Sequence, residues 1–160
     1  FEGETSLRGP NLSSTLKKSK TRTMRERTMV EMFVNLMNGT DGGLELLQVL
    51  AENSFDSILV TDASAEGKIT YANGSFEKLT GHTPDSVIGK TPRILQGPAT
   101  DEKVIARLSD ALKTGSEFEG KAINYKKNGT PFIMYWRVLP IKVGGKITAW
   151  VAIQREGAVI

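Results

Sequence analysis

The sequence predicts an α+β fold in which two short strands and several small helices precede three long strands. Two dipeptides indicate antiparallel pairing late in the chain, because Asn128-Gly129 and Gly144-Gly145 are both typical of tight hairpin turns. The segments that flank these turns are rich in aromatic and branched residues, as strands usually are. Helically spaced apolar residues and glycine stops indicate helices in the middle of the chain.

The individual elements follow from these signals in order. Apolar runs bounded by turn residues predict the early strands, and alternating aromatic and branched residues predict the late ones, which gives strands at 57–62, 68–72, 118–125, 132–141 and 146–155. Phe76 and Leu79 before the Gly81 stop indicate one short helix, and Pro84–Ile88 after a capping Thr83 indicates another. A longer helix has a clear apolar stripe and ends at Gly115; the stripe is Val104, Ile105, Leu108, Ala111 and Leu112.

Composition limits the classes of function. The chain has 160 residues, no cysteine and a single histidine, His82, which excludes disulfides, thiolate metal sites, cysteine nucleophiles and multi-histidine metal centres. No plausible nucleophile or acid–base pair is evident, so we expect no enzyme activity and no metal. No apolar run approaches the eighteen or so residues of a membrane span, so we expect a cytoplasmic protein.

Charge and spacing divide the chain into segments. Residues 1–28 hold seven Lys or Arg and three Glu, while the remainder holds 14 basic and 15 acidic residues, so the basic character lies in the N-terminal tail. We expect a flexible basic arm over 1–22, a helical cap over 23–52, a folded domain over 53–157 and the start of a C-terminal linker at 158–160. The arm could contact nucleic acid, but such runs are more often only solvated.

The predicted cap consists of two helices. The first, Met24–Asn38, has an apolar stripe at three- and four-residue steps, formed by Met29, Met32, Phe33, Leu36 and Met37. The second follows a capping Asp41 and carries Leu44, Leu46, Leu47 and Leu50. Two interpretations of the methionine-rich stripe remain open: it packs on its own domain, or it forms a homodimer contact.

One stretch, residues 89–101, stands out because Gly or Pro residues occur near both of its ends. Pro92 suits the first turn of a short helix, and Thr100 or Asp101 can cap the helix that follows. Arg93 and Gln96 are three residues apart, so we expect them to share one face of that short turn.

This stretch and the segments around it resemble one family of sensor domains. Several motifs recur in order, namely Ile69–Asn73, Phe76, Leu79–Gly81, Val87–Gly89 and Asn124–Phe132. The run from about Asn53 to Gly157 resembles the light-oxygen-voltage (LOV) branch of the Per-Arnt-Sim (PAS) domains. Their motif G-x-N-C-R-F-L-Q-G-P is matched here by G-K-T-P-R-I-L-Q-G-P. The resemblance implies a five-stranded antiparallel sheet with small helices on one face, enclosing a pocket that in the family holds flavin mononucleotide (FMN).

Four positions keep the family's FMN-binding residue types. The resemblance implies that Arg93 would pair with the flavin phosphate and that Gln96 would lie beside the ribityl chain. It implies that Asn124 would face the pyrimidine edge of the ring and that Gln154, on the last strand, would hydrogen-bond the ring. Three of them also have a specific structural interpretation: an ion pair with a carboxylate for Arg93, hairpin chemistry for Asn124, and satisfaction of a sheet edge for Gln154.

Four other positions depart from the family. Thr91 replaces an asparagine, and Pro92 replaces the photoactive cysteine. Ser109 stands where a second phosphate-binding arginine is often found, and Met134 replaces the second ring-binding asparagine. Each of the last two changes removes a hydrogen-bonding partner of a flavin, so FMN binding is expected to be weakened.

The resemblance implies a sensory or regulatory module of a larger signalling protein, which controls an effector by rearranging its dimer and its flanking helices without a cysteine adduct. The alternative is a cysteine-less flavin-binding photoreceptor or redox sensor. A flavin enzyme has little support from these residues.

Overall fold

The computed structural model describes residue 31 and residues 42–158. The chain divides into two compact units, Phe1–Leu46 and Leu47–Ile160, which are described separately here. The predicted arm, the predicted helix Met24–Asn38 and Asp41, the predicted cap of the second helix, lie outside the described residues, except that Glu31 is helical. Helix α3 (Gly42–Glu52) matches the second predicted cap helix, and the boundary between the units falls within it.

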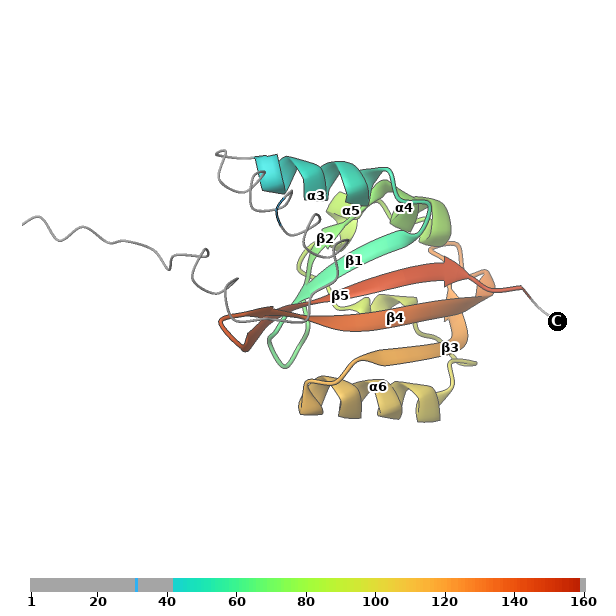
Figure 1. Ribbon diagram of the computed structural model, residues 1–160. Coiled ribbons are helices and arrows are strands. Elements are labelled where there is room, and N and C mark those ends of the chain that lie inside the picture. The colour runs from blue at the N-terminus through green and yellow to red at the C-terminus, as the bar shows by residue number, and fades with distance from the viewer. Residues whose placement is uncertain (1–30, 32–41, 159–160) are drawn as a thin grey trace, which may run out of the picture. The chain divides into compact units, whose positions relative to one another are not determined.

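The second unit contains a five-stranded antiparallel sheet, which confirms the predicted α+β fold (Figure 1). Its strands run in the order β2-β1-β5-β4-β3, so β1 and the two C-terminal strands occupy the middle. Their bounds are β1 (Ser57–Asp62), β2 (Ile69–Ala72), β3 (Phe118–Tyr125), β4 (Pro131–Val143) and β5 (Lys146–Glu156). The two predicted glycine turns join β3 to β4 and β4 to β5.

The short helices lie between β2 and β3 in the chain. They are α4 (Gly74–Thr80), α5 (Pro84–Val87), the 3₁₀ helix η2 (Pro92–Leu95) and α6 (Glu102–Thr114). Helix α4 lies against β1, α5 against β2, and α6 along the edge strand β3 (Figure 1). Helix α5 ends one residue before the predicted Ile88, which lies in the turn that follows the helix.

The helix ends largely follow the predicted signals. Gly81 and Gly115 adopt left-handed backbone angles and end α4 and α6. Asp101 caps α6, because its side chain accepts a hydrogen bond from the Lys103 N–H at 2.9 Å. The predicted cap at Thr83 is wrong in one respect: Thr83 stands at the N-cap position of α5, but its side chain makes no capping hydrogen bond. The Ser86 N–H, a donor that such a cap would satisfy, donates to the Thr83 carbonyl at 3.1 Å instead.

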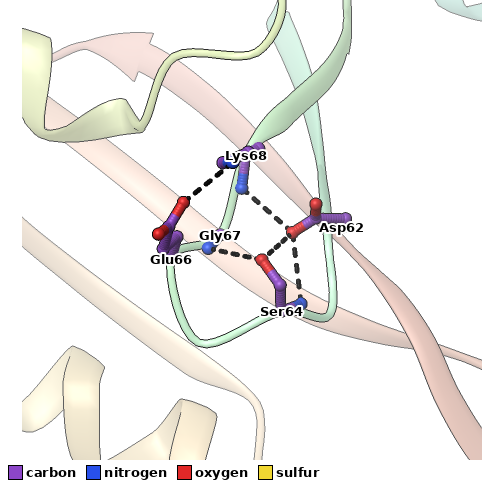
Figure 2. Close-up of polar contacts among 5 residues, drawn as sticks. All are labelled: Asp62, Ser64, Glu66, Gly67 and Lys68. Carbon is purple, nitrogen blue, oxygen red and sulfur yellow. Dashed lines mark hydrogen bonds and ion pairs between the residues drawn. The ribbon is translucent and has the colours of Figure 1, made fainter.

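The tight loop between β1 and β2 is organised by one carboxylate. Figure 2 shows Asp62 Oδ1 accepting hydrogen bonds from Ser64 N at 3.1 Å, Ser64 Oγ at 2.6 Å and Lys68 N at 3.0 Å. These bonds, the Ser64 hydroxyl first, lower the pKa of Asp62. Glu66 pairs with the Lys68 ammonium at 2.9 Å, and Gly67 closes the turn with φ of 62°. The loop thus satisfies its own polar groups.

One hydrophobic core joins the small helices to one face of the sheet, which we call the inner face. Alternate residues of the strands point inward, as the period of two in a half-buried sheet requires. Phe76, Val87 and Leu95 bring α4, α5 and η2 onto this face, and all three are at most 1% exposed. The central part of the inner face is therefore covered, and the core residues on it are removed from water.

Candidate functional site

Three of the predicted site residues meet on the inner face of the sheet. Asn124 on β3, Met134 on β4 and Gln154 on β5 are all buried, with 3–4% of their surface exposed. Asn124 pairs with Phe132 and Met134 pairs with Ala122, so the two lie diagonally across neighbouring strands. Sequence spacing alone could not show this juxtaposition, because it depends on the register of β3, β4 and β5.

The two buried amides are engaged within the protein. The Ser57 hydroxyl on β1 donates to Gln154 Oε1 at 3.0 Å, and these residues face each other in the strand register. The Asn124 amide nitrogen donates to the Ala122 carbonyl at 3.4 Å. Every buried side-chain nitrogen or oxygen in the described part of the chain has a hydrogen-bond partner. The inner face therefore holds no unpaired polar atom there that would mark a missing ligand.

Large apolar side chains occupy the rest of the inner face. Trp136 is 5% exposed and pairs with Gln154 in the β4–β5 register. Its ring centroid lies 5.5 Å from that of Phe118, with the planes tilted by 40°. Leu59 and Phe132 are also buried in this core. Sequence reasoning did not assign Trp136 or Ser57 to the site, although both occupy inward positions of clearly alternating strands.

Four other candidate residues lie on or beside η2. Thr91 and Pro92 are half-buried at its start, and Arg93 is exposed. The prediction that Arg93 and Gln96 share a face of one helical turn is wrong, because the 3₁₀ turn ends at Leu95 and Gln96 is extended. Gln96 is half-buried, and its N–H donates to the Arg93 carbonyl at 3.0 Å. Buried Leu95 anchors the turn to the core, which leaves Arg93 on the surface.

Arg93 and Ser109 are the two residues at the predicted phosphate positions. The Arg93 side chain makes no hydrogen bond or ion pair with another residue of the described segments; only the Arg93 carbonyl is engaged, by the Gln96 N–H. Ser109 is half-buried on α6, and its hydroxyl cannot supply the positive charge of the arginine it replaces. Among the two, only Arg93 could neutralise a phosphate.

A second cluster, missed by sequence reasoning, centres on Asn73. This side chain is fully buried, with Oδ1 accepting from Ile58 N at 2.9 Å and from Phe76 N at 3.0 Å. Its amide nitrogen donates to the carbonyls of Ala51 at 2.8 Å and Asp56 at 3.1 Å. Asn73 therefore joins the last turn of α3 to β1 and α4. An Asn directly before a helix was the available signal, but only its capping role could be predicted from it.

Three further contacts lie at this junction. The Tyr71 hydroxyl on β2 hydrogen-bonds Glu52, the last residue of α3, and the Ser75 hydroxyl donates to the Ser54 carbonyl at 2.6 Å. Burial and then the hydrogen bond to Glu52 raise the pKa of Tyr71 to about 12. Arg155 on β5 pairs with the Asp56 carboxylate at 2.6 Å. Polar contacts thus link the end of α3 to β2, and the segment between α3 and β1 to α4 and β5.

Comparison with known proteins now decides the family. A profile described as PAS domain matches residues 56–156, which is more than half of the chain. The chain belongs to the PAS domain family. Within it, the chain is LOV-like, as the sequence motifs predicted: it is 38% identical to phototropin-2 of Oryza sativa subsp. japonica over 102 residues. It is also 38% identical to a blue-light-activated histidine kinase of Brucella anthropi over 92 residues.

Solved structures agree with this assignment. The LOV domain of the Erythrobacter litoralis blue-light-activated histidine kinase has a TM-score of 0.61 and 29% identity, covering 63% of this chain and 94% of that one. A LOV domain studied with a flavin analogue has a TM-score of 0.66 and 26% identity, covering 71% and 85%. This PAS domain is therefore a sensory and regulatory module, as predicted.

The curated relatives are much longer than the match. The aligned segment is 62% of this chain but 11% of the rice phototropin, and 57% of this chain but 19% of the Brucella kinase. In the described segments, no helix is long and apolar enough to cross a membrane. The same segments hold no cluster of three or more metal-ligating side chains.

Proposed function

We propose that this PAS domain regulates an effector elsewhere in a longer protein by changing how its flanking segments pack, without forming a cysteine adduct. Pro92 occupies the motif position of the photoactive cysteine, and the chain contains no cysteine. The domain acts as the sensor, and the effector carries the output. The match covers only 11% of the rice phototropin and 19% of the Brucella kinase. These shares support the proposal that the output is carried by an effector in a longer protein.

The observation that carries the proposal is a continuous polar path from the inner face to α3. The path begins at Gln154, whose side chain is held by Ser57 at the start of β1. The next residue back, Asp56, offers its carbonyl to Asn73, and Asn73 in turn holds the Ala51 carbonyl in α3. A rearrangement at Gln154 would therefore move the start of β1 and loosen the end of α3. Each hydrogen bond of this path is buried or half-buried, so its geometry depends on its neighbours. That dependence is what would let a change at Gln154 reach α3.

The inner face does not fit the ring of FMN. The polar edge of the ring would meet the Met134 thioether in place of an amide, at about 1–3 kcal/mol for an unpaired buried group. Loss of the second phosphate-binding charge at Ser109 costs a further 1.5–3 kcal/mol or so. Together these losses lower affinity by about two to four decades. Gln154 and Asn124 are already engaged within the protein. We therefore propose that FMN binds weakly.

A cysteine-less flavin photoreceptor or redox sensor is the second candidate. Retention of Arg93, Gln96, Asn124 and Gln154 at the motif positions supports it, as do the printed names of the relatives that refer to blue light. Arg93 would hold the phosphate, and the bound flavin would supply light absorption and electron transfer. This candidate requires Gln154 to exchange its bond with Ser57 for one with the ligand.

We also propose that the protein is a homodimer in which the helical cap forms the contact. Within the second unit, three apolar side chains of α3 support this: Leu47, Val49 and Leu50 are 56–57% exposed. The predicted methionine-rich stripe of 24–38 is the other apolar surface that we assign to this contact. A two-fold contact would bury it, because the same patch meets itself across the axis.

The proposed path is tested by removing the Ser57 hydroxyl. Ser57→Ala frees Gln154 Oε1 inside the core, and we expect faster amide hydrogen exchange in the last turn of α3 and at Asn73. Thr148→Ala is the matched control, because the exposed Thr148 hydroxyl also makes one hydrogen bond, to the Ile141 carbonyl at 3.3 Å. If both variants leave α3 exchange unchanged, or change it equally, the path does not couple the inner face to the cap.

A further inference from the structure

A groove with several lysines lies outside the inner face. It runs between the C-terminal end of α4 and the turn that joins β3 to β4, and it has a volume of about 460 Å³. Its lining consists of Lys78, Thr80, Gly81, Lys126, Lys127 and Asn128, which we call the lysine groove. No acidic side chain is part of this lining.

The two walls of the lysine groove are fixed to each other. The Lys127 N–H donates to the Thr80 carbonyl at 2.8 Å, which ties the hairpin turn to the end of α4. Thr80 is fully buried, and its hydroxyl donates to the Phe76 carbonyl at 2.8 Å. Gly81, with φ of 76°, brings its backbone close to the Lys127 side chain. The groove therefore exists before any ligand binds, which lowers the ordering cost of binding.

The groove carries excess positive charge. Lys126 is neutralised in part, because its ammonium lies 3.1 Å from the Glu156 carboxylate and 5.3 Å from the Phe132 ring centroid. Lys78 and Lys127 are exposed, and neither forms an ion pair with any residue that the structure describes. Part of this charge stabilises the end of α4, where the helix carbonyls are negative.

We propose that the lysine groove binds an acidic peptide segment of a partner protein. Lysines on two walls can neutralise carboxylates of an extended segment without demanding one geometry, since an ammonium is a compact charge on a flexible stem. The lining lacks arginine, whose planar fork favours phosphate, and lacks an exposed aromatic ring on which a nucleic-acid base could stack. Its volume matches a ligand of a few residues.

The neighbouring imidazole supplies an independent readout. His82 is the only histidine of the chain, so its ring signals are unique in a spectrum. Burial, and then the charges of Lys127 and Lys90, lower the pKa of His82. A carboxylate held between these groups would oppose the lysine charges and raise the pKa of His82.

The test titrates the full chain with a hexaglutamate peptide and follows backbone amide shifts by nuclear magnetic resonance. We expect shifts at Gly81 and Asn128, a higher pKa of His82 and weaker binding at raised salt. The double substitution Lys78→Gln and Lys127→Gln should weaken binding at these amides about tenfold.

Two controls distinguish binding at the lysine groove from nonspecific attraction of the peptide to any lysine. Lys113→Gln with Lys142→Gln removes the same charge from exposed positions on α6 and β4, and should leave the affinity at the groove unchanged. A hexaglutamine peptide should produce no shifts. Equal weakening by both double variants, an unchanged pKa of His82, or tighter binding of a hexameric RNA than of hexaglutamate would each overturn the proposal.

Discussion

Replacing Asn73 by alanine should destabilise the domain strongly and release the end of α3. The side chain is fully buried and makes four hydrogen bonds, two as acceptor and two as donor. Alanine would leave the amides of Ile58 and Phe76 and the carbonyls of Ala51 and Asp56 without this partner. The effect should therefore combine the loss of a helix cap with the loss of three further internal bonds.

The magnitude follows from these four contacts. Loss of the N-cap bond to Phe76 costs about 1 kcal/mol. Each of the other three bonds contributes about 0.5–1.5 kcal/mol, and water entering the vacated space recovers part of the loss. We expect Asn73→Ala to lower the free energy of unfolding by about 3 kcal/mol, which is a large share of the stability of an ordinary domain.

Urea unfolding of the variant provides the measurement, with hydrogen exchange to locate the effect. Asn53→Ala is the matched control, since the Asn53 amide also donates to a carbonyl of α3, that of Val49 at 2.8 Å, but from an exposed position. The control should change stability by less than about 0.5 kcal/mol. A loss below about 1 kcal/mol for Asn73→Ala, or an equal loss for the control, would show that Asn73 is not the centre of this junction.

The remaining predictions concern the inner face, pH and assembly. Met134→Asn and Ser109→Arg should each raise FMN affinity in calorimetric titration, by up to about two decades, and unchanged affinity would place these residues away from the flavin. The raised pKa of Tyr71, about 12 against an ordinary 10.0, favours the neutral phenol in the folded state, so this contribution is complete below pH 10 and is lost as pH rises towards 12. Tyr71→Phe should remove that part of the pH dependence of the free energy of unfolding. If the variant loses as much stability between pH 10 and 12 as the unsubstituted chain, ionisation of Tyr71 is not the cause. The full chain should sediment as a dimer and a chain starting at Asp41 as a monomer; identical behaviour would contradict the cap contact.

The fold could be predicted because its signals are local. The hairpin turn at Gly144-Gly145 requires two positive φ angles, 58° and 78°, which few residues other than glycine adopt. The stop at Gly81 and the cap at Asp101 are likewise set by single residues. The predicted bounds of β4 were accurate to one or two residues, because burial alternates along this strand as far as Val138.

The site was less predictable because its contacts are not local. The Ser57–Gln154 bond joins residues 97 positions apart, and it depends on β1 pairing with β5. Asn73 holds Ala51, 22 residues earlier, which its capping role does not require. The position of Gln96 outside η2 follows from the tighter 3₁₀ turn, which no spacing of apolar residues could reveal.

The central claim is that this PAS domain signals through its own side-chain contacts, with at most weak flavin binding and no thiol adduct. The most direct test purifies the full chain after expression with excess FMN and records its absorption before and after blue illumination. We predict substoichiometric flavin absorption that is lost on dialysis, with no thermally recovering adduct. Pro92→Cys alone should not fully restore the photochemistry, because Thr91 and Met134 remain. Stoichiometric flavin that survives dialysis, or reversible bleaching of the unsubstituted chain that persists in oxygen, would contradict the claim.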